Sequence, residues 1–167
     1  MRIKLTRQEM AAVDQAAALR WQLARASGVA NQKRAGESDD DLDKLGLKAE
    51  MAVAKCLCLT YSPQSLGIDN GIDMWFGDVG IDVKATFHPS GKLLFKSLEA
   101  FKADAAILVT KTDEADVMDV IGGVMRNKFQ THAQQVNLGR GLCWIMPQGE
   151  LSPIEKVWAV LTAKQHC

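Results

Sequence analysis

Two acids and a lysine stand close together within residues 71–86, and their types suit metal-assisted chemistry. This stretch predicts a β-hairpin with Asp73 on its first arm and Asp82, Val83 and Lys84 on its second. Because side chains alternate along a strand, Asp82 and Lys84 share one face and Val83 takes the other. Cross-strand pairing can bring Asp73 and Asp82 within reach of one ion. Two carboxylates and an amine at one point can hold a divalent cation and act on a phosphodiester.

Each of these groups has an expected role in such a site. Magnesium prefers oxygen ligands and keeps several waters, so two or three carboxylates suffice. We expect Asp73 and Asp82 to bind the ion, with the Val83 main-chain carbonyl as a further ligand. Glu50, on the preceding helix, would bind directly or through water, and Lys84 would polarise the attacking water or steady the phosphate. The alternative is that Asp73 and Asp82 face solvent on the hairpin and Lys84 pairs with one of them, since exposed cross-strand ion pairs are common and contribute little stability.

Two helices are predicted ahead of the hairpin. Thr6 and Glu9 have the spacing of a capping box, and the helix after them runs to about residue 27. Its apolar stripe consists of Met10, Val13, Ala17, Trp21 and Ala24. Residues 28–43 are polar and aperiodic and predict a mobile loop. A second helix is expected from about 43–46 to 59, with an apolar face of Leu47, Met51, Ala54 and Leu57/Cys58 and with Glu50 beside it.

The rest of the chain predicts mainly short strands. The hairpin arms are expected at 72–76 and 81–86, and further strands at 92–96, 105–110, 117–121 and 143–146. The glycine pair at 122–123 is expected to stop one strand. A short helix is predicted at 125–135 and a last one after Ser152-Pro153, with Ser as N-cap and Pro as first residue. This order predicts an α/β protein with a central mixed β-sheet flanked by helices.

Charge distribution, cysteine spacing and apolar content exclude some classes of protein but do not identify the function. The 167 residues carry a formal net charge of zero, but residues 1–35 hold seven Lys/Arg against two acids, and residues 36–50 hold six acids against two lysines. We therefore expect a basic N-terminal helix (1–35) on a domain at 36–167, forming one compact domain overall. The four cysteines have no metal-binding spacing, so zinc is not expected and reduced, buried thiols are. No apolar run is long enough for a membrane span and the N-terminus lacks a signal peptide, which predicts a cytoplasmic protein.

Three segments carry a family resemblance: GLKAEMAVAK at 46–55, GID at 71–73 and IDVKAT at 81–86. Their residues and order resemble the PD-(D/E)xK nuclease superfamily, over roughly residues 40–125, and within it the small bacteriophage-encoded members. The resemblance implies a restriction-endonuclease-like αβββαβ core with an extra N-terminal helix. The matched active-site positions are Glu50, Asp73, Asp82 and Lys84. The chain departs from the motif with Ile72 in place of Pro and with Asp82 in place of the commoner Glu.

The same resemblance predicts a metal-dependent endonuclease that hydrolyses DNA with Mg²⁺, for which Mn²⁺ would substitute. Few insertions suggest recognition of DNA structure or backbone rather than a long sequence. The form of DNA that the enzyme would cut, whether duplex, junction, flap or single strand, stays open. The sequence also leaves open whether the protein is a homodimer. A phage-encoded protein would act in the host cytoplasm. Two other readings also stay open: an inactive nuclease-fold protein that binds nucleic acid or a protein partner, and an interaction protein acting through its basic N-terminal helix.

Further residues are candidates for nucleic-acid contacts outside the motif. They are Thr86, His88, Arg126, Lys128 and Gln130. For His88 a role in capping the turn after the strand is favoured, and an exposed helix face explains Arg126 and Lys128 equally well. Trp75 could stack on a base, but a core position is favoured. Trp144 and Trp158 are expected to be core or interface anchors.

Overall fold

The computed structural model describes residues 1–27, 39–63, 71–139 and 141–164. Along the chain the elements are β1 (Arg2–Lys4), α1 (Arg7–Ser27), α2 (Asp39–Cys56), β2 (Met74–Phe76), β3 (Val79–Thr86), β4 (Leu93–Phe95), β5 (Ala105–Lys111), β6 (Val117–Met125), α3 (Arg126–His132), β7 (Gln134–Asn137), β8 (Leu142–Met146), a 3₁₀ turn (Gln148–Glu150) and α4 (Ile154–Lys164). The expected α/β class is confirmed. Whether the core is restriction-endonuclease-like stays a prediction.

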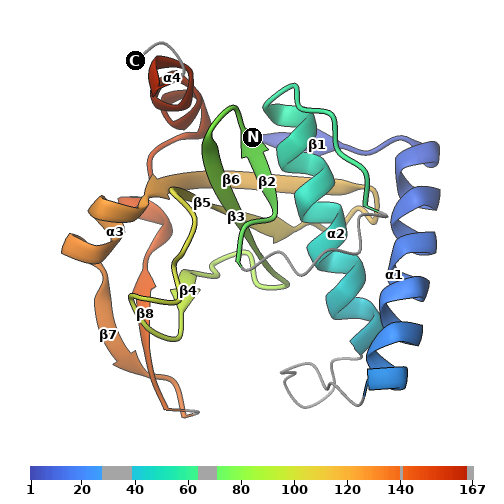
Figure 1. Ribbon diagram of the computed structural model, residues 1–167, viewed down its shortest axis with the longest axis horizontal. Helices are drawn as coiled ribbons and strands as arrows, with labels where there is room; N and C mark the ends of the chain where they lie inside the picture. Colours follow the sequence, from blue (N-terminus) through green and yellow to red (C-terminus); the bar gives the residue numbers. More distant parts are fainter. Residues whose placement is uncertain (28–38, 64–70, 140, 165–167) are drawn as a thin grey trace.

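A mixed five-stranded sheet organises the molecule (Figure 1). Its strand order is β1-β6-β5-β3-β2, with β3 and β5 parallel and the other neighbours antiparallel. The continuous apolar run of β5 fits its central place, because a strand covered on both faces has no polar side to present. β3 lies beside it and carries Asp82 and Lys84, so the candidate site residues start from a rigid part of the fold.

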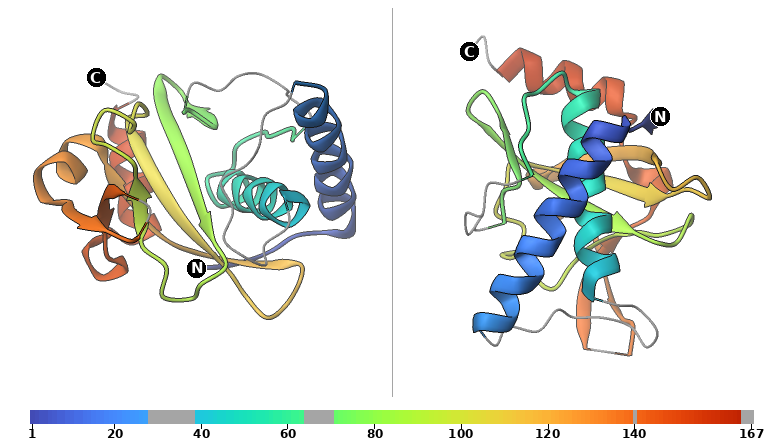
Figure 2. Two further views of the ribbon diagram at one scale, coloured as in Figure 1. Left: turned by 90° about the horizontal axis from the view of Figure 1, so that it is seen from below. Right: turned by 90° about the vertical axis from the view of Figure 1, so that its right-hand side faces the viewer.

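Separate apolar clusters cover the two faces of this sheet. On one face, α2 and α4 pack over Ile81, Val83, Ile107 and Val109. On the other, Ala106 and Leu108 pack with the second sheet, of order β4-β8-β7, and with Phe129 of α3. Figure 2 shows α2, with α1 outside it, on the opposite side of the sheet from α3 and β8. β3 is therefore held from both sides.

Helix α1 begins and packs as the sequence predicts. The Thr6 main-chain N–H donates to Glu9 Oε2 at 2.6 Å, and the Glu9 N–H donates to Thr6 Oγ1 at 3.2 Å, which is a reciprocal capping box. Val13, Ala16 and Ala17 pack on Leu47 of α2. The predicted stripe residues Trp21 and Ala24 have side chains outside the described part of the chain. The helix thus lies against α2 close to Glu50, and its small residues allow a close approach.

Strand β6 corrects the prediction that Gly122-Gly123 stops it. The strand continues to Met125, with a bulge where the pairing shifts between Leu108 and Val109 of β5. A Cβ atom on Gly122 would lie 2.4 Å from the Ser152 carbonyl oxygen, and one on Gly123 would lie 2.7 Å from that of Ala106. The glycines therefore serve close backbone packing, because no larger residue fits there.

Other boundaries also differ from expectation. Helix α2 starts at Asp39 rather than near 43, since acidic residues suit a helix N-terminus and extend it. The proposed boundary at 35/36 lies outside the described residues. Helix α4 starts at Ile154, one residue later than predicted, because the main chain of Ser152 pairs with Gly123. The strand at 93–95 joins the second sheet, and the short edge strands β1 and β7 were not predicted.

Two expectations about composition can be compared with the described residues. Their cysteines are free thiols, but only Cys143 is buried; Cys56 is half-buried and Cys58 is exposed, which corrects the expectation of buried thiols. Among the described helices, none has the length and apolar character needed to cross a membrane.

Candidate active site

Asp73 lies where β2 separates from β3. Its main-chain N–H donates to the Ile81 carbonyl at 2.9 Å, so the backbone is still paired at this point. Its side-chain Oδ2 accepts the Val83 N–H at 2.6 Å. A carboxylate oxygen thus takes the place of a main-chain acceptor at the end of the hairpin ladder. This hydrogen bond fixes the Asp73 carboxylate against the edge of β3, beside Asp82 and Lys84.

Asp82 and Lys84 share one face of β3, as strand alternation predicts. Lys84 Nζ lies 2.6 Å from Asp82 Oδ1, and the side chains are 39% and 2% exposed respectively. The ammonium group also lies 5.2 Å from the centre of the Phe95 ring. Burial of one charge and partial exposure of the other is unlike a surface ion pair. The alternative of a solvent-facing Asp82 is therefore wrong, because the second sheet covers this face.

Glu50 reaches the same region from α2 and is also buried, with 8% of its surface exposed. The Tyr61 hydroxyl donates a hydrogen bond to Glu50 Oε2. Arg20 of α1 places Nη1 3.8 Å from Glu50 Oε1. Neither partner was predicted from the sequence. Neither has a motif spacing, and only the packing of α1 and of the segment after α2 brings them to Glu50.

The three carboxylates influence one another electrostatically. Burial raises the pKa of Asp73 to about 8, and the negative charges of Glu50 and Asp82 act in the same direction. The Val83 N–H and the Lys84 ammonium oppose this rise. The pKa of Tyr61 is also raised, first by burial and then by the charge of Glu50, so its hydroxyl stays a donor. The negative charges of Glu50 and Asp82 thus make ionisation of Asp73 less favourable.

The donor set fits a hard divalent cation in its chemistry. Asp73, Asp82 and Glu50 offer oxygen ligands only, which is what Mg²⁺ prefers. A raised Asp73 pKa indicates a place where added positive charge is favourable. As placed, no three Asp, Glu, His or Cys side chains of the described residues form a group that could hold an ion. The carboxylates instead have protein partners: the Val83 N–H, Lys84 and Tyr61.

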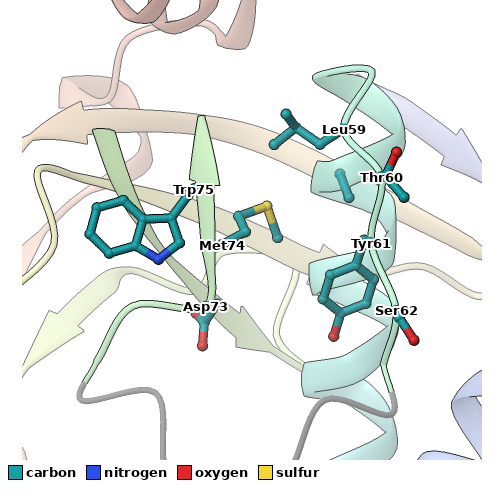
Figure 3. A pocket seen from close by; sticks show the side chains of 8 residues that line it. Leu59, Thr60, Tyr61, Ser62, Asp73, Met74 and Trp75 are labelled. Carbon is teal, nitrogen blue, oxygen red and sulfur yellow. The ribbon is translucent and has the colours of Figure 1, made fainter. Parts of the chain in front are cut away.

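A pocket of about 320 Å³ adjoins these acids (Figure 3). It lies between β2 and the segment that follows α2. Its described lining consists of Ala54, Leu59, Thr60, Tyr61, Ser62, Asp73, Met74 and Trp75. Asp73 and Tyr61 belong to both the pocket and the acid cluster, so the two are continuous.

The other predicted contact residues have structural partners or lie apart. Thr86 Oγ1 accepts the His88 N–H at 3.2 Å, and the His88 carbonyl accepts the Gly91 N–H at 2.9 Å, so these residues build the turn after β3. Arg126 donates to the Lys102 carbonyl at 2.6 Å and Lys128 to that of Glu150 at 3.0 Å. Gln130 is exposed on α3. Their roles in binding nucleic acid stay predictions.

The tryptophans correct one expectation. Trp75 is 57% exposed rather than in the core, because β2 is an edge strand whose even-numbered neighbours Met74 and Phe76 take the buried face. Trp144 packs at the edge of the second apolar cluster, as expected. Trp158 is 43% exposed on α4 and so is not a core residue.

Comparison with models of known protein families, with characterised proteins and with solved structures gave no significant match.

Proposed function

We propose that the protein is a metal-dependent endonuclease that hydrolyses DNA phosphodiester bonds and recognises DNA structure or backbone. The observation that carries this proposal is the buried Asp82, paired with Lys84, beside an Asp73 whose pKa is raised to about 8. Burying several acidic groups in one place destabilises a fold, and such clusters of perturbed groups are concentrated at functional sites. A divalent cation and a phosphodiester are ligands that these groups suit.

The order of elements around the site supports a PD-(D/E)xK assignment. Glu50 comes from a helix, Asp73 directly precedes the next strand, and Asp82 and Lys84 come from the strand after it. We propose that α2, β2, β3 and β5 correspond to the first four elements of the αβββαβ core expected from the motif, whereas β6 follows β5 without the helix that this motif places there. β4 would then be an addition that belongs to the second sheet, and α1 the extra N-terminal helix.

Each residue has a proposed role. Asp73, Asp82 and Glu50, with the Val83 carbonyl, would hold Mg²⁺ or Mn²⁺. When bound, the ion supplies Lewis-acid stabilisation of phosphate charge and lowers the pKa of water. Lys84 donates hydrogen bonds that orient the attacking water or a phosphate oxygen.

Tyr61 and Arg20 are positioning residues in this proposal, because they hold Glu50 rather than touch the reacting atoms. The basic N-terminal helix then has a place in the mechanism through Arg20. A homodimer and a cytoplasmic location stay predictions from the sequence.

The test is a cleavage assay on end-labelled duplex, flap, four-way junction and single-stranded DNA, with Mg²⁺ or Mn²⁺. At least one form is expected to be cut. Lys84→Ala is expected to abolish the cutting, whereas Lys96→Ala, an exposed lysine beside β4, should leave it intact. No hydrolysis of any form under these conditions, by a folded protein, would contradict the proposal and favour the inactive nuclease-fold alternative.

A further inference from the structure

The pocket beside the acid cluster has two walls of different origin (Figure 3). Leu59 and Tyr61 reach toward β2 from the segment after α2, and Met74 reaches back toward them from β2. Ala54 of α2 also contributes to the lining. A volume of about 320 Å³ lies at the lower end of the range typical of small-molecule sites. The pocket is large enough for one flat ring system.

The lining suits a heteroaromatic ring rather than a purely apolar group. Leu59, Met74 and the Tyr61 ring offer apolar and aromatic surface. Asp73 is a polar member of the same lining, and Thr60 and Ser62 contribute to it with their hydroxyl groups pointing away from β2 (Figure 3). A nucleobase has this combination of a stacking face and a hydrogen-bonding edge.

The position of the pocket ties its occupant to the reaction. Asp73 lines the pocket and also bonds to β3 beside Asp82 and Lys84. Tyr61 lines it and bonds to Glu50. A nucleotide whose phosphate lies at the acid cluster therefore has its own or its neighbour's base at the pocket. A base that stays stacked and paired in a duplex cannot enter such a pocket without being flipped out.

We propose that this pocket binds one unpaired nucleobase next to the phosphate to be cut, so that the substrate is DNA with unpaired nucleotides at the cleavage point. Single strands and the single-stranded parts of flaps belong to this class, and fully paired duplex does not. The inference rests on the proposed function, and it adds the form of DNA that the same site takes.

The experiment is an abasic scan with the full-length protein. A single-stranded oligonucleotide is made in a series, each member lacking one base at a different position, and cleavage of each phosphate is followed with Mg²⁺. Loss of the base at one fixed position relative to the cut is expected to slow cleavage about 5- to 150-fold, the equivalent of about 1–3 kcal/mol of base–aromatic stacking. Equal cleavage of every member would overturn the pocket proposal while leaving the nuclease proposal intact.

A matched pair of variants locates the effect. Leu59→Trp fills the pocket and should remove the dependence on the missing base, together with most of the cleavage of the intact strand. Leu142→Trp makes the same change on β8, where Leu142 is 62% exposed, and should behave like the original protein. Melting curves followed by circular dichroism establish that both variants fold. Because the scan itself uses the unchanged protein, a folding defect in Leu59→Trp does not remove the test.

The two proposals fail in different ways. If no DNA is cut, the nuclease proposal fails, and binding of the same abasic series is measured by fluorescence anisotropy with Ca²⁺ in place of Mg²⁺. A position-dependent loss of affinity would still support the base pocket. Affinity that ignores the missing base at every position would overturn it.

Discussion

Two acid–base pairs on neighbouring parts of the main sheet combine the same types of charge but differ in their surroundings. Asp82 and Lys84 lie 2.6 Å apart, and the Asp82 side chain is only 2% exposed. Asp104 and Arg126 lie 3.6 Å apart, with side chains 38% and 41% exposed. Both pairs involve residues at strand β3 or at the ends of β5 and β6. The two pairs differ in how deeply their acidic side chains are buried.

Hydrogen bonds explain what the exposed pair does. Asp104 Oδ2 accepts the Gly80 N–H at 3.0 Å, and the Asp104 carbonyl accepts the Arg126 N–H at 2.8 Å. Arg126 also donates to the Lys102 carbonyl. These contacts tie together the chain segments at one end of β3, β5 and β6. The exposed pair therefore stabilises the ends of these strands, whereas the buried pair lies next to the acidic side chains of Asp73 and Glu50.

The largest expected difference between the two pairs is in activity. Asp82→Asn should lower DNA cleavage on the order of 10³-fold, because it removes a ligand charge at the reacting centre. Asp104→Asn should leave the rate within about twofold, since surface polar changes of this kind act weakly. The measurement is the single-turnover rate with Mg²⁺ on the DNA form that the protein cuts. Equal losses of cleavage rate in the two variants would contradict the different roles assigned to the two pairs.

The partners of Glu50 should have an intermediate effect. Tyr61→Phe removes one hydrogen bond to a charged group, worth about 1.5–3 kcal/mol, and should reduce kcat on the order of 10- to 100-fold. If Tyr61 positions Glu50, the variant should also need more Mg²⁺ for half-maximal rate, in addition to any fall in its melting temperature. A loss confined to stability, with the Mg²⁺ requirement unchanged, would show that Tyr61 only supports the fold.

Stability should depend on pH through Asp73. Its native pKa, raised from 3.8 to about 8, means that the folded state binds the proton more tightly than the unfolded state. Without metal, the free energy of unfolding should therefore fall as the pH rises from about 4 to about 8. Asp73→Asn should flatten this dependence, and the measurement is urea unfolding at a series of pH values. A stability that rises across the window because of Asp73 would contradict the assigned shift.

The smallest effect is expected at Arg126. Arg126→Ala should lower the free energy of unfolding by about 1 kcal/mol or less from the ion pair, because exposed pairs contribute little. Cleavage and its dependence on salt should be unchanged if the arginine serves the scaffold alone. A weaker salt dependence of DNA binding in the variant would instead support the phosphate contact that the sequence suggested.

The site could be predicted only where local periodicity determines geometry. Alternation along β3 was enough to put Asp82 and Lys84 on one face, and hairpin pairing was enough to bring Asp73 to them. Tyr61 and Arg20 could not be found in this way, because their approach to Glu50 depends on how α1 and the segment after α2 pack. The prediction of a core position for Trp75 was wrong, because the exposure of its side chain depends on the place of β2 at the edge of the sheet, which the local sequence does not determine.

The fold shows the same limit. The capping box of Thr6 and Glu9 and the apolar run of β5 are local signals, and both elements formed as predicted. Gly122 and Gly123 were expected to end β6, because a glycine pair usually interrupts a strand. Their purpose is to let Ser152 and Ala106 approach closely, which involves residues distant in sequence.

The most direct test is titration calorimetry of Mn²⁺ into the protein and into its Asp82→Asn and Asp104→Asn variants. We expect saturable binding to the unchanged protein and to Asp104→Asn, and loss of that binding in Asp82→Asn. Absence of Mn²⁺ binding to the folded protein, or equal binding to all three, would contradict the assignment of the buried pair to a metal site.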